Sequence, residues 1–254
     1  SEILSDFNKW KQDVLELGQY KIPRWWSNFD FDKSKHVKKY LSVFCDASKS
    51  GYGCCLYYHA ENEKGETVVR FIAGKSHVVP VVMMNRPKGV EDHCDSIPKL
   101  ELQAAKTAAI MRDFVVRESG LNFDEILMWS DSMTVLRWIQ SWKHKFKTFE
   151  TYRLKKIRLL TDVSEWHYVS TDCNPADMAS KGLFATEKKK WNYWFQGPKF
   201  LHSPRSEWPD FEEKTKQKNQ KVVDIASVAA RESRRERASW NRTFWIRFNN
   251  SSVS

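Results

Sequence analysis

The sequence predicts an α/β fold with a mixed five-stranded sheet, in which an antiparallel meander of three strands is followed by parallel strands and helices flank the sheet. Over residues 40–73, short runs rich in β-branched and aromatic residues alternate with turns, which is typical of a meander. Helical patterns separate the later apolar runs at 125–130 and 165–170, as in parallel strands. A length of 254 residues allows one large core, or one domain with appendages.

Four segments are expected along the chain. Phe7 and Trp10 begin a run of apolar residues at helical spacing that Pro23 ends, and we expect this first helix to pack back on the domain that follows. An N-terminal helix with a linker, a main domain, an aromatic wrap, and a charged linker with a basic tail of helical character are expected at residues 1–37, 38–186, 187–211 and 212–254.

Within the main domain, helix starts are marked by capping residues. Ser96 before Pro98 predicts a helix to about Arg117, because Ser is a favourable N-cap and the first turn does not use the N–H that Pro lacks. Asn174 before Pro175 predicts the start of another helix in the same way. The prolines and mixed charge of residues 78–94 predict a loop. The predicted strands are residues 40–46, 54–59, 67–73, 125–130 and 165–170.

The net charge of +10 and the pI of about 9.3 favour a polyanionic partner, with nucleic acid ahead of a membrane surface. The plain alternative is that the charge serves solubility. No stretch approaches the ~20 apolar residues of a membrane span, and we expect no membrane partner. Because the chain begins with Ser1 rather than Met, a piece of a longer protein is expected.

The five cysteines are odd in number and form no CxxC pair, so the sequence predicts neither a disulfide framework nor a zinc ribbon. A reducing, intracellular compartment, cytoplasmic or nuclear, fits this pattern best.

Residues 137–158 combine many Lys and Arg side chains with interleaved aromatic ones. Such a mixture suits a surface that follows a nucleic-acid backbone, because cations meet phosphates and rings meet sugars or bases. The alternative is a helix whose aromatic residues are core and whose lysines are solvated.

Asp46 ends the first predicted strand, and the chain then turns through small residues that include Gly51 and Gly53. An acid in an apolar strand is costly to bury unless it is hydrogen-bonded or holds a cation. Taken alone, Asp46 is equally explained as an Asx-turn residue that caps the strand.

Three further acids lie where elements begin or end. Glu101 falls in the first turn of the predicted helix, Asp131 follows the strand at 125–130 and precedes a helix predicted from residue 133 to 142, and Asp177 follows Pro175. Each has an ordinary explanation: a solvated helix glutamate, an N-cap, and a favourable charge at a helix N-terminus.

Together, the four acids predict a shared site, because ligands of open α/β sheets bind beyond the carboxyl ends of the strands. We expect no Arg or Lys of these motifs to compensate them. Converging carboxylates repel one another, and divalent cations would relieve the repulsion. Hard oxygen ligands suit Mg²⁺ or Mn²⁺ better than zinc.

Short stretches around the four acids occur in a specific order: Phe44-Cys45-Asp46-Ala47-Ser48 with Gly51-Tyr52-Gly53, Gly74-Lys75-Ser76, Ile97-Pro98-Lys99-Leu100-Glu101-Leu102, Trp129-Ser130-Asp131-Ser132 with Trp138-Ile139, Asn174-Pro175-Ala176-Asp177-Met178-Ala179-Ser180-Lys181-Gly182, and Gly197-Pro198-Lys199-Phe200-Leu201. The ordered set resembles the ribonuclease H domain of a BEL/Pao-type LTR retrotransposon reverse transcriptase. The resemblance runs from about Trp10 to Leu201, and a fainter likeness continues to Phe248.

The resemblance implies a ribonuclease H-like fold and a catalytic, metal-binding quartet of Asp46, Glu101, Asp131 and Asp177. The quartet would hold two Mg²⁺ ions ~4 Å apart, with Mn²⁺ as a substitute, and Asp46 would bridge both. The implied activity is metal-dependent endoribonuclease cleavage of the RNA strand of an RNA–DNA hybrid. The terminal extensions would connect the domain to a larger reverse transcriptase polyprotein or to a protein partner.

Contacts to the hybrid are expected from residues near the acids and from the basic stretch. The 2′-hydroxyl of RNA would be read near residues 48–53 and at the start of the helix that carries Glu101. Gly51 and Gly53 would keep the neighbouring turn slim enough for the hybrid to approach. The candidate nucleic-acid-binding residues are Ser48, Gly51, Lys75, Lys99, Ser132, Trp138, Lys143, Lys145, Lys147 and Arg153.

Two other functions compete with this one. The first is a domesticated, non-catalytic module of the same fold that binds nucleic acid or protein. The second is another nuclease or transferase of the same general fold, which would cut a DNA duplex. Incubation with a labelled hybrid separates the first from an enzyme, and a panel of substrates separates the second.

Overall fold

The computed structural model describes residues 2–22, 37–79, 97–142 and 145–208. They lie in the first of two compact units, residues 1–215. The second unit, residues 216–254, lies outside the described residues, and so do the predicted basic tail and most of the predicted loop at 78–94.

The centre of the fold is a five-stranded sheet of order β3-β2-β1-β4-β5, which confirms the predicted mixed sheet. β1, β2 and β3 pair antiparallel as the expected meander, whereas β4 pairs parallel with both β1 and β5. The strands are β1 Lys38–Ala47, β2 Gly51–Glu61, β3 Thr67–Val78, β4 Glu125–Ser130 and β5 Trp166–Tyr168.

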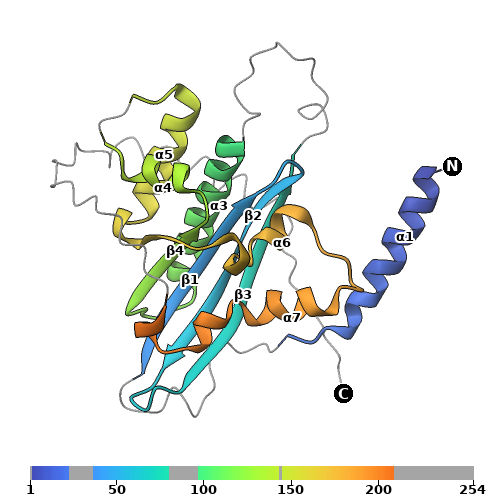
Figure 1. Cartoon of the computed structure of the whole chain (residues 1–254), viewed down its shortest axis with the longest axis horizontal. Coiled ribbons are helices and arrows are strands. Elements are labelled where there is room, and N and C mark those ends of the chain that lie inside the picture. Colours follow the sequence, from blue (N-terminus) through green and yellow to red (C-terminus); the bar gives the residue numbers. More distant parts are fainter. Residues whose placement is uncertain (1, 23–36, 80–96, 143–144, 209–254) are drawn as a thin grey trace. The chain divides into compact units, whose positions relative to one another are not determined.

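Helices cover both sides of the sheet. Figure 1 shows α3, α4 and α5 together on one side and α6 and α7 on the other. In α3 the side chains of Ala104, Ala105 and Ala108 are fully buried, and the helix lies against β1 and β2 because alanine leaves it a shallow face. The longer helices beside the sheet are α3 Ile97–Glu118, α4 Met133–Gln140, α5 Thr148–Leu160 and α7 Lys188–Gln196, and the short one is α6 Asp177–Lys181.

β1 is buried on both faces because it lies in the middle of the sheet. Its alternate residues Tyr40 and Phe44 enter a core cluster that also contains Trp129, Leu201 and Trp208. The Phe44 and Trp129 rings stack with their centroids 6.0 Å apart. The expected aromatic wrap thus contains a regular helix, α7, and contributes two side chains to the core.

The N-terminal helix α1, Glu2–Glu16, and Tyr20 just after it contact the rest of the unit through hydrogen bonds and through the Tyr20 ring, whose centroid lies 5.0 Å from that of Trp191. The N–H of Ala185 donates to Asp13 Oδ1 at 2.8 Å, and the Tyr20 hydroxyl donates to the carbonyl of Ala185 at 2.6 Å. Trp10, which we expected to pack on the domain, is 59% exposed. Among the described helices, none has the length and apolar character needed to cross a membrane.

Arg205 joins the C-terminal end of the described chain to the sheet. Its guanidinium donates two hydrogen bonds of 2.8 Å to the Glu125 carboxylate at the start of β4, and these bonds, more than any other effect, lower the pKa of Glu125. A carboxylate whose pKa is lowered by folding stabilises the protein above its unfolded pKa of about 4.3, and this stabilisation is lost as the pH falls through the lower folded value.

We therefore predict that Glu125→Gln lowers the free energy of unfolding at pH 7 by no more than about 1 kcal/mol, because the pair is partly exposed. The difference from the unaltered protein should begin to shrink near pH 4.3, about the unfolded pKa of a Glu side chain, and should vanish once the pH is below the lower folded pKa of Glu125. Urea unfolding at several pH values measures it. Glu118→Gln, an exposed acid at the end of α3, is the control, and a difference that does not change with pH would contradict the assignment.

Candidate active site

Asp46 lies within β1, opposite Gly53 of β2, and is 9% exposed. The turn that follows is organised by another residue: the Ser48 hydroxyl accepts the N–H groups of Ser50 at 3.1 Å and Gly51 at 3.2 Å. The Asx-turn explanation of Asp46 is therefore wrong, and its carboxylate is available for other contacts.

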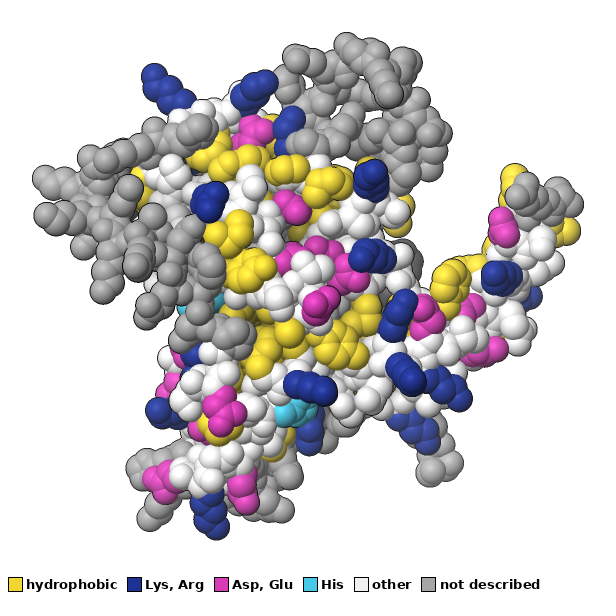
Figure 2. All heavy atoms as spheres, in the orientation of Figure 1, with side chains coloured by type: hydrophobic (Ala, Val, Ile, Leu, Met, Phe, Trp, Pro, Cys, Tyr) yellow, Lys and Arg dark blue, Asp and Glu magenta, His cyan; other side chains and the backbone are white. Residues whose placement is uncertain are grey.

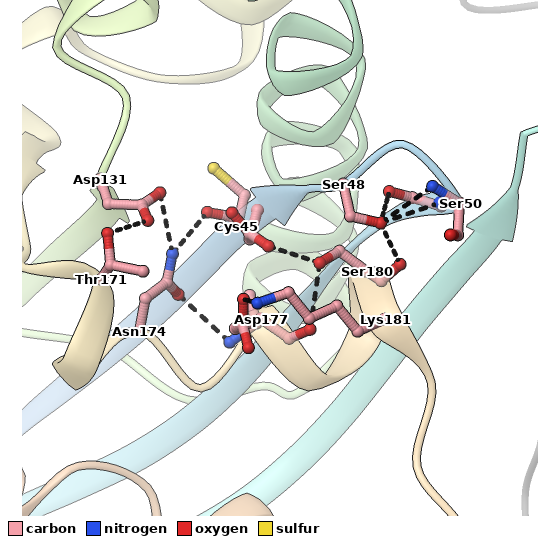
Figure 3. Close-up of polar contacts among 12 residues, drawn as sticks. Cys45, Ser48, Ser50, Asp131, Thr171, Asn174, Asp177, Ser180 and Lys181 are labelled. Atoms are coloured by element: carbon pink, nitrogen blue, oxygen red, sulfur yellow. Dashed lines mark hydrogen bonds and ion pairs between the residues drawn. The ribbon is translucent and has the colours of Figure 1, made fainter. Parts of the chain in front are cut away.

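Asp131 does not cap α4. The N-cap is Ser132, whose hydroxyl accepts the N–H of Val135 at 3.3 Å. Asp131 instead accepts hydrogen bonds from the Thr171 hydroxyl at 2.8 Å and from the Asn174 amide at 3.3 Å (Figure 3). The capping explanation of this acid is also wrong.

Glu101 is half-buried on α3 and accepts a hydrogen bond of 2.5 Å at Oε2 from the Ser132 hydroxyl. Ser132, which we expected to contact nucleic acid, thus uses its hydroxyl to connect Glu101 with the segment after β4. This contact excludes the explanation of Glu101 as a freely solvated helix residue.

Asn174 holds the start of α6 beside β1. Its amide group donates to the carbonyl of Cys45 at 3.0 Å, and its side-chain oxygen accepts the N–H of Ala176 at 3.1 Å. This bond forms a turn ahead of the helix. The N-cap of α6 is Ala176, without a side-chain capping bond, so the predicted cap at Asn174 and helix start at Pro175 are wrong by two residues. Asp177, the first residue of α6, forms an ion pair of 2.6 Å with Lys181 one turn later. The expectation that no basic residue of these motifs compensates the acids is wrong for Asp177.

α6 approaches the first two strands very closely. A Cβ at Gly51 would lie 2.9 Å from the carbonyl oxygen of Ser180, and a Cβ at Gly53 would lie 2.8 Å from the Cβ of Ala179. The Ser48 hydroxyl donates to the carbonyl of Ser180 at 2.7 Å (Figure 3). The two glycines therefore make room for α6, which is a more direct role than the predicted approach of a hybrid.

The acids influence one another. Burial, above all, raises the pKa of Asp46 to about 6; the hydrogen bond from Ser180 opposes this, and the charges of Asp131 and Asp177 add to it. Burial also raises the pKa of Glu101, opposed by Ser132 and assisted by Asp131. Asp46 thus lies within electrostatic range of Asp131 and Asp177, and Glu101 lies within range of Asp131.

The chemistry of this donor set fits a hard divalent cation. It offers carboxylate oxygens only, and the repulsion that raises the pKa of Asp46 is the kind that Mg²⁺ relieves. Within the described part of the chain, however, no three Asp, Glu, His or Cys side chains are grouped closely enough to hold one ion. The acids are instead bonded to neighbouring side chains of their own, and they would have to move closer together to share an ion.

Figure 2 shows acidic side chains gathered near the middle of the face where β1 ends and α6 begins, with Lys and Arg side chains around them. Among the candidate nucleic-acid-binding residues, Lys145 and Lys147 are exposed, whereas Lys75 is half-buried. Lys143 lies outside the described residues.

Three other candidate nucleic-acid-binding residues contact aromatic rings. The Arg153 guanidinium lies 3.3 Å from the centroid of the Phe149 ring, and the Lys99 ammonium lies 5.7 Å from the same centroid. Trp138 is half-buried and packs edge-on against Phe146, with centroids 5.9 Å apart. Lys99 of α3 and Arg153 of α5 thus share the ring of Phe149.

Other members of the basic stretch have structural roles. Lys156 is 7% exposed, so it does not belong to a phosphate-binding surface. The Arg158 guanidinium donates to the carbonyls of Trp138, Ile139 and Ser141 and thereby satisfies the C-terminal end of α4. The prediction of a uniformly basic, nucleic-acid-binding stretch is wrong at these two positions.

The five-stranded sheet flanked by helices, with acids from four elements at one end, defines a ribonuclease H-like fold. A family model, the Pao retrotransposon-like RNaseH-like domain, matches residues 1–132. The chain belongs to this family. The matched range includes Asp46, Glu101 and Asp131, and Asp177 lies beyond it. A search of curated proteins found no match to the chain.

Solved structures with likeness to the chain include two ribonucleases H and a complex. RNase H1 of the archaeon Halobacterium salinarum is 13% identical, with 57% of this chain and 95% of that chain covered and a TM-score of 0.34. The N-terminal RNase H domain of a Mycobacterium tuberculosis protein is 14% identical, with 61% and 99% covered and a TM-score of 0.35. LC11-RNase H1, solved with an RNA/DNA hybrid, is 14% identical, with 59% and 98% covered and a TM-score of 0.31.

Sequence reasoning missed the side chains that bond to the acids: Ser180, Thr171 and Lys181. Ser180 donates to Asp46 Oδ2, and the two residues are 134 positions apart. The sequence signal for Ser180 and Lys181 was their spacing: they follow Asp177 by three and four residues, so on a helix they lie on the same side as that acid.

Asn174 connects β1, Asp131 and α6 at a buried position, since it is 2% exposed. We predict that Asn174→Ala lowers the free energy of unfolding by about 1–3 kcal/mol, because it leaves the buried carbonyl of Cys45 without this donor. Denaturant unfolding measures the loss. Asn192→Ala, which removes an exposed amide from α7, is the control, and equal effects of the two substitutions would refute the assignment.

Proposed function

We propose that this domain is a metal-dependent endoribonuclease that hydrolyses the RNA strand of RNA–DNA hybrids. The observation that carries the proposal is the arrangement of Asp46, Glu101, Asp131 and Asp177 at one end of the sheet. None of the first three has the local structural role that its position in the sequence suggested.

The acids have the partners that a binding site needs. Glu101 accepts a hydrogen bond from Ser132, which follows β4, and Asp131 accepts bonds from Thr171 and Asn174, which follow β5. Folding therefore brings α3, β4 and the segment before α6 together. Two bound Mg²⁺ or Mn²⁺ ions would activate a water and stabilise the leaving oxygen of an in-line displacement. Asp46 would hold these ions together with the other acids, because the charges of Asp131 and Asp177 both act on its carboxylate.

The surface beside the site supports a polyanionic substrate. Exposed Lys145 and Lys147 precede α5, and Arg153 lies flat against an aromatic ring. Such side chains contact phosphates and sugars with little dependence on sequence. In this proposal they hold the hybrid, while the terminal extensions join the domain to a larger reverse transcriptase or another protein partner.

A cleavage assay tests the activity. The full chain, incubated with Mg²⁺ and an RNA–DNA hybrid labelled on either strand, should cut the RNA and leave both the DNA strand and a DNA duplex intact. Asp46→Asn and Asp131→Asn should each reduce cleavage to background, because each removes a charged ligand. Asp113→Asn, an acid of α3 that pairs with Arg117, is the control and should retain activity.

A second function, a non-catalytic binding module, is favoured by the absence of a ready three-ligand group among the described residues. It predicts that the unaltered protein binds the hybrid but cuts nothing over a broad range of Mg²⁺ and Mn²⁺ concentrations. Cleavage of a DNA duplex instead would favour a different nuclease of the same fold.

A further inference from the structure

The side chain of Ser180, in α6, reaches β1. It is 2% exposed, and its hydroxyl lies 2.5 Å from Asp46 Oδ2 and 3.0 Å from the backbone carbonyl of Asp177 (Figure 3). A single hydroxyl therefore lies between the side chain of one acid and the main chain of another.

The proton of this hydroxyl goes to Asp46. A serine hydroxyl donates only once, and Asp46 offers the nearer acceptor. A charged carboxylate also accepts a stronger hydrogen bond than a peptide carbonyl does. The common alternative for a helical serine, a bond to its own preceding turn, is the longer of the two contacts.

The main chain of Ser180 is fixed independently. Its carbonyl accepts the Ser48 hydroxyl, and the neighbouring carbonyl of Ala179 accepts the Ser76 hydroxyl at 2.5 Å. Gly51 leaves room for the Ser180 carbonyl, because a Cβ at position 51 would lie only 2.9 Å from the carbonyl oxygen. Two hydrogen bonds and the close approach to Gly51 therefore hold the backbone from which the Ser180 side chain extends.

From this geometry we propose that Ser180 is a positioning residue for the metal site, a proposal that rests on the proposed function. Its hydrogen bond occupies one lone pair of Asp46 Oδ2 and fixes the rotation of the carboxylate. A carboxylate has about four lone-pair positions, so the others stay open to cations. Such outer partners typically change metal affinity or activity by about 10–100-fold when they are removed.

The test measures Mn²⁺ binding to the full chain without substrate, by the electron paramagnetic resonance of free Mn²⁺, together with the thermal unfolding temperature. Ser180→Ala should weaken Mn²⁺ binding by about 10–100-fold. Ser180→Cys keeps the size of the side chain but has a weak donor, and it should weaken binding in the same way. Ser180→Thr, which keeps a hydroxyl at the same carbon, should restore most of the affinity.

Ser76→Ala is the matched control, because the Ser76 hydroxyl donates to the carbonyl of Ala179 in α6 and this bond does not involve Asp46. If the two substitutions lower the unfolding temperature equally, Ser76→Ala should weaken Mn²⁺ binding far less than Ser180→Ala does. Equal weakening by the two variants, or unchanged binding in a folded Ser180→Ala protein, would overturn the positioning role. An unaltered protein that binds no Mn²⁺ would instead overturn the proposed metal-dependent function itself, and the positioning role with it.

Discussion

The site depends on the close approach of α6 to the first two strands. A helix of five residues is too short to persist by itself in water, so its position comes from what it touches. Gly51 leaves room for the carbonyl of Ser180 and Gly53 for the side chain of Ala179, and the hydroxyls of Ser48 and Ser76 donate to two carbonyl groups of the helix. The position of Asp177 therefore depends on the two glycines of β2 as much as on the hydrogen bonds that hold α6.

β1 supplies the core and the site at once. Phe44 is fully buried among aromatic rings, and Asp46, two residues later on the same face, is nearly buried as well. The rigid aromatic packing fixes the strand, and the strand then carries its acid into a region of low dielectric. The raised pKa of Asp46 is the electrostatic consequence, because burial and like charges both disfavour ionisation.

The strands, the main helices and the order of the acids could be predicted from sequence, because each depends on local periodicity and capping. The alternation around Phe44 and the alanine face of α3 are examples. The partners of the acids could not, because Ser180 and Thr171 meet Asp46 and Asp131 only through tertiary folding, 134 and 40 residues away. Local composition also gave no means to separate buried Lys156 from exposed Lys155, since both lie in one basic run.

The identity of these partners has a chemical meaning. Asp46, Glu101 and Asp131 accept bonds from the neutral groups of Ser180, Ser132, Thr171 and Asn174. A guanidinium in their place would orient the acids equally well but would neutralise them and compete with a cation. Hydroxyl and amide donors orient a carboxylate and leave its charge in place. Among the described residues, Asp177 is the one of the four acids with an ammonium partner, Lys181. The Lys181 side chain is 62% exposed, so water can solvate its ammonium group when the side chain swings away. The arrangement preserves a concentrated negative charge at the end of β1, which is the property a divalent cation site requires.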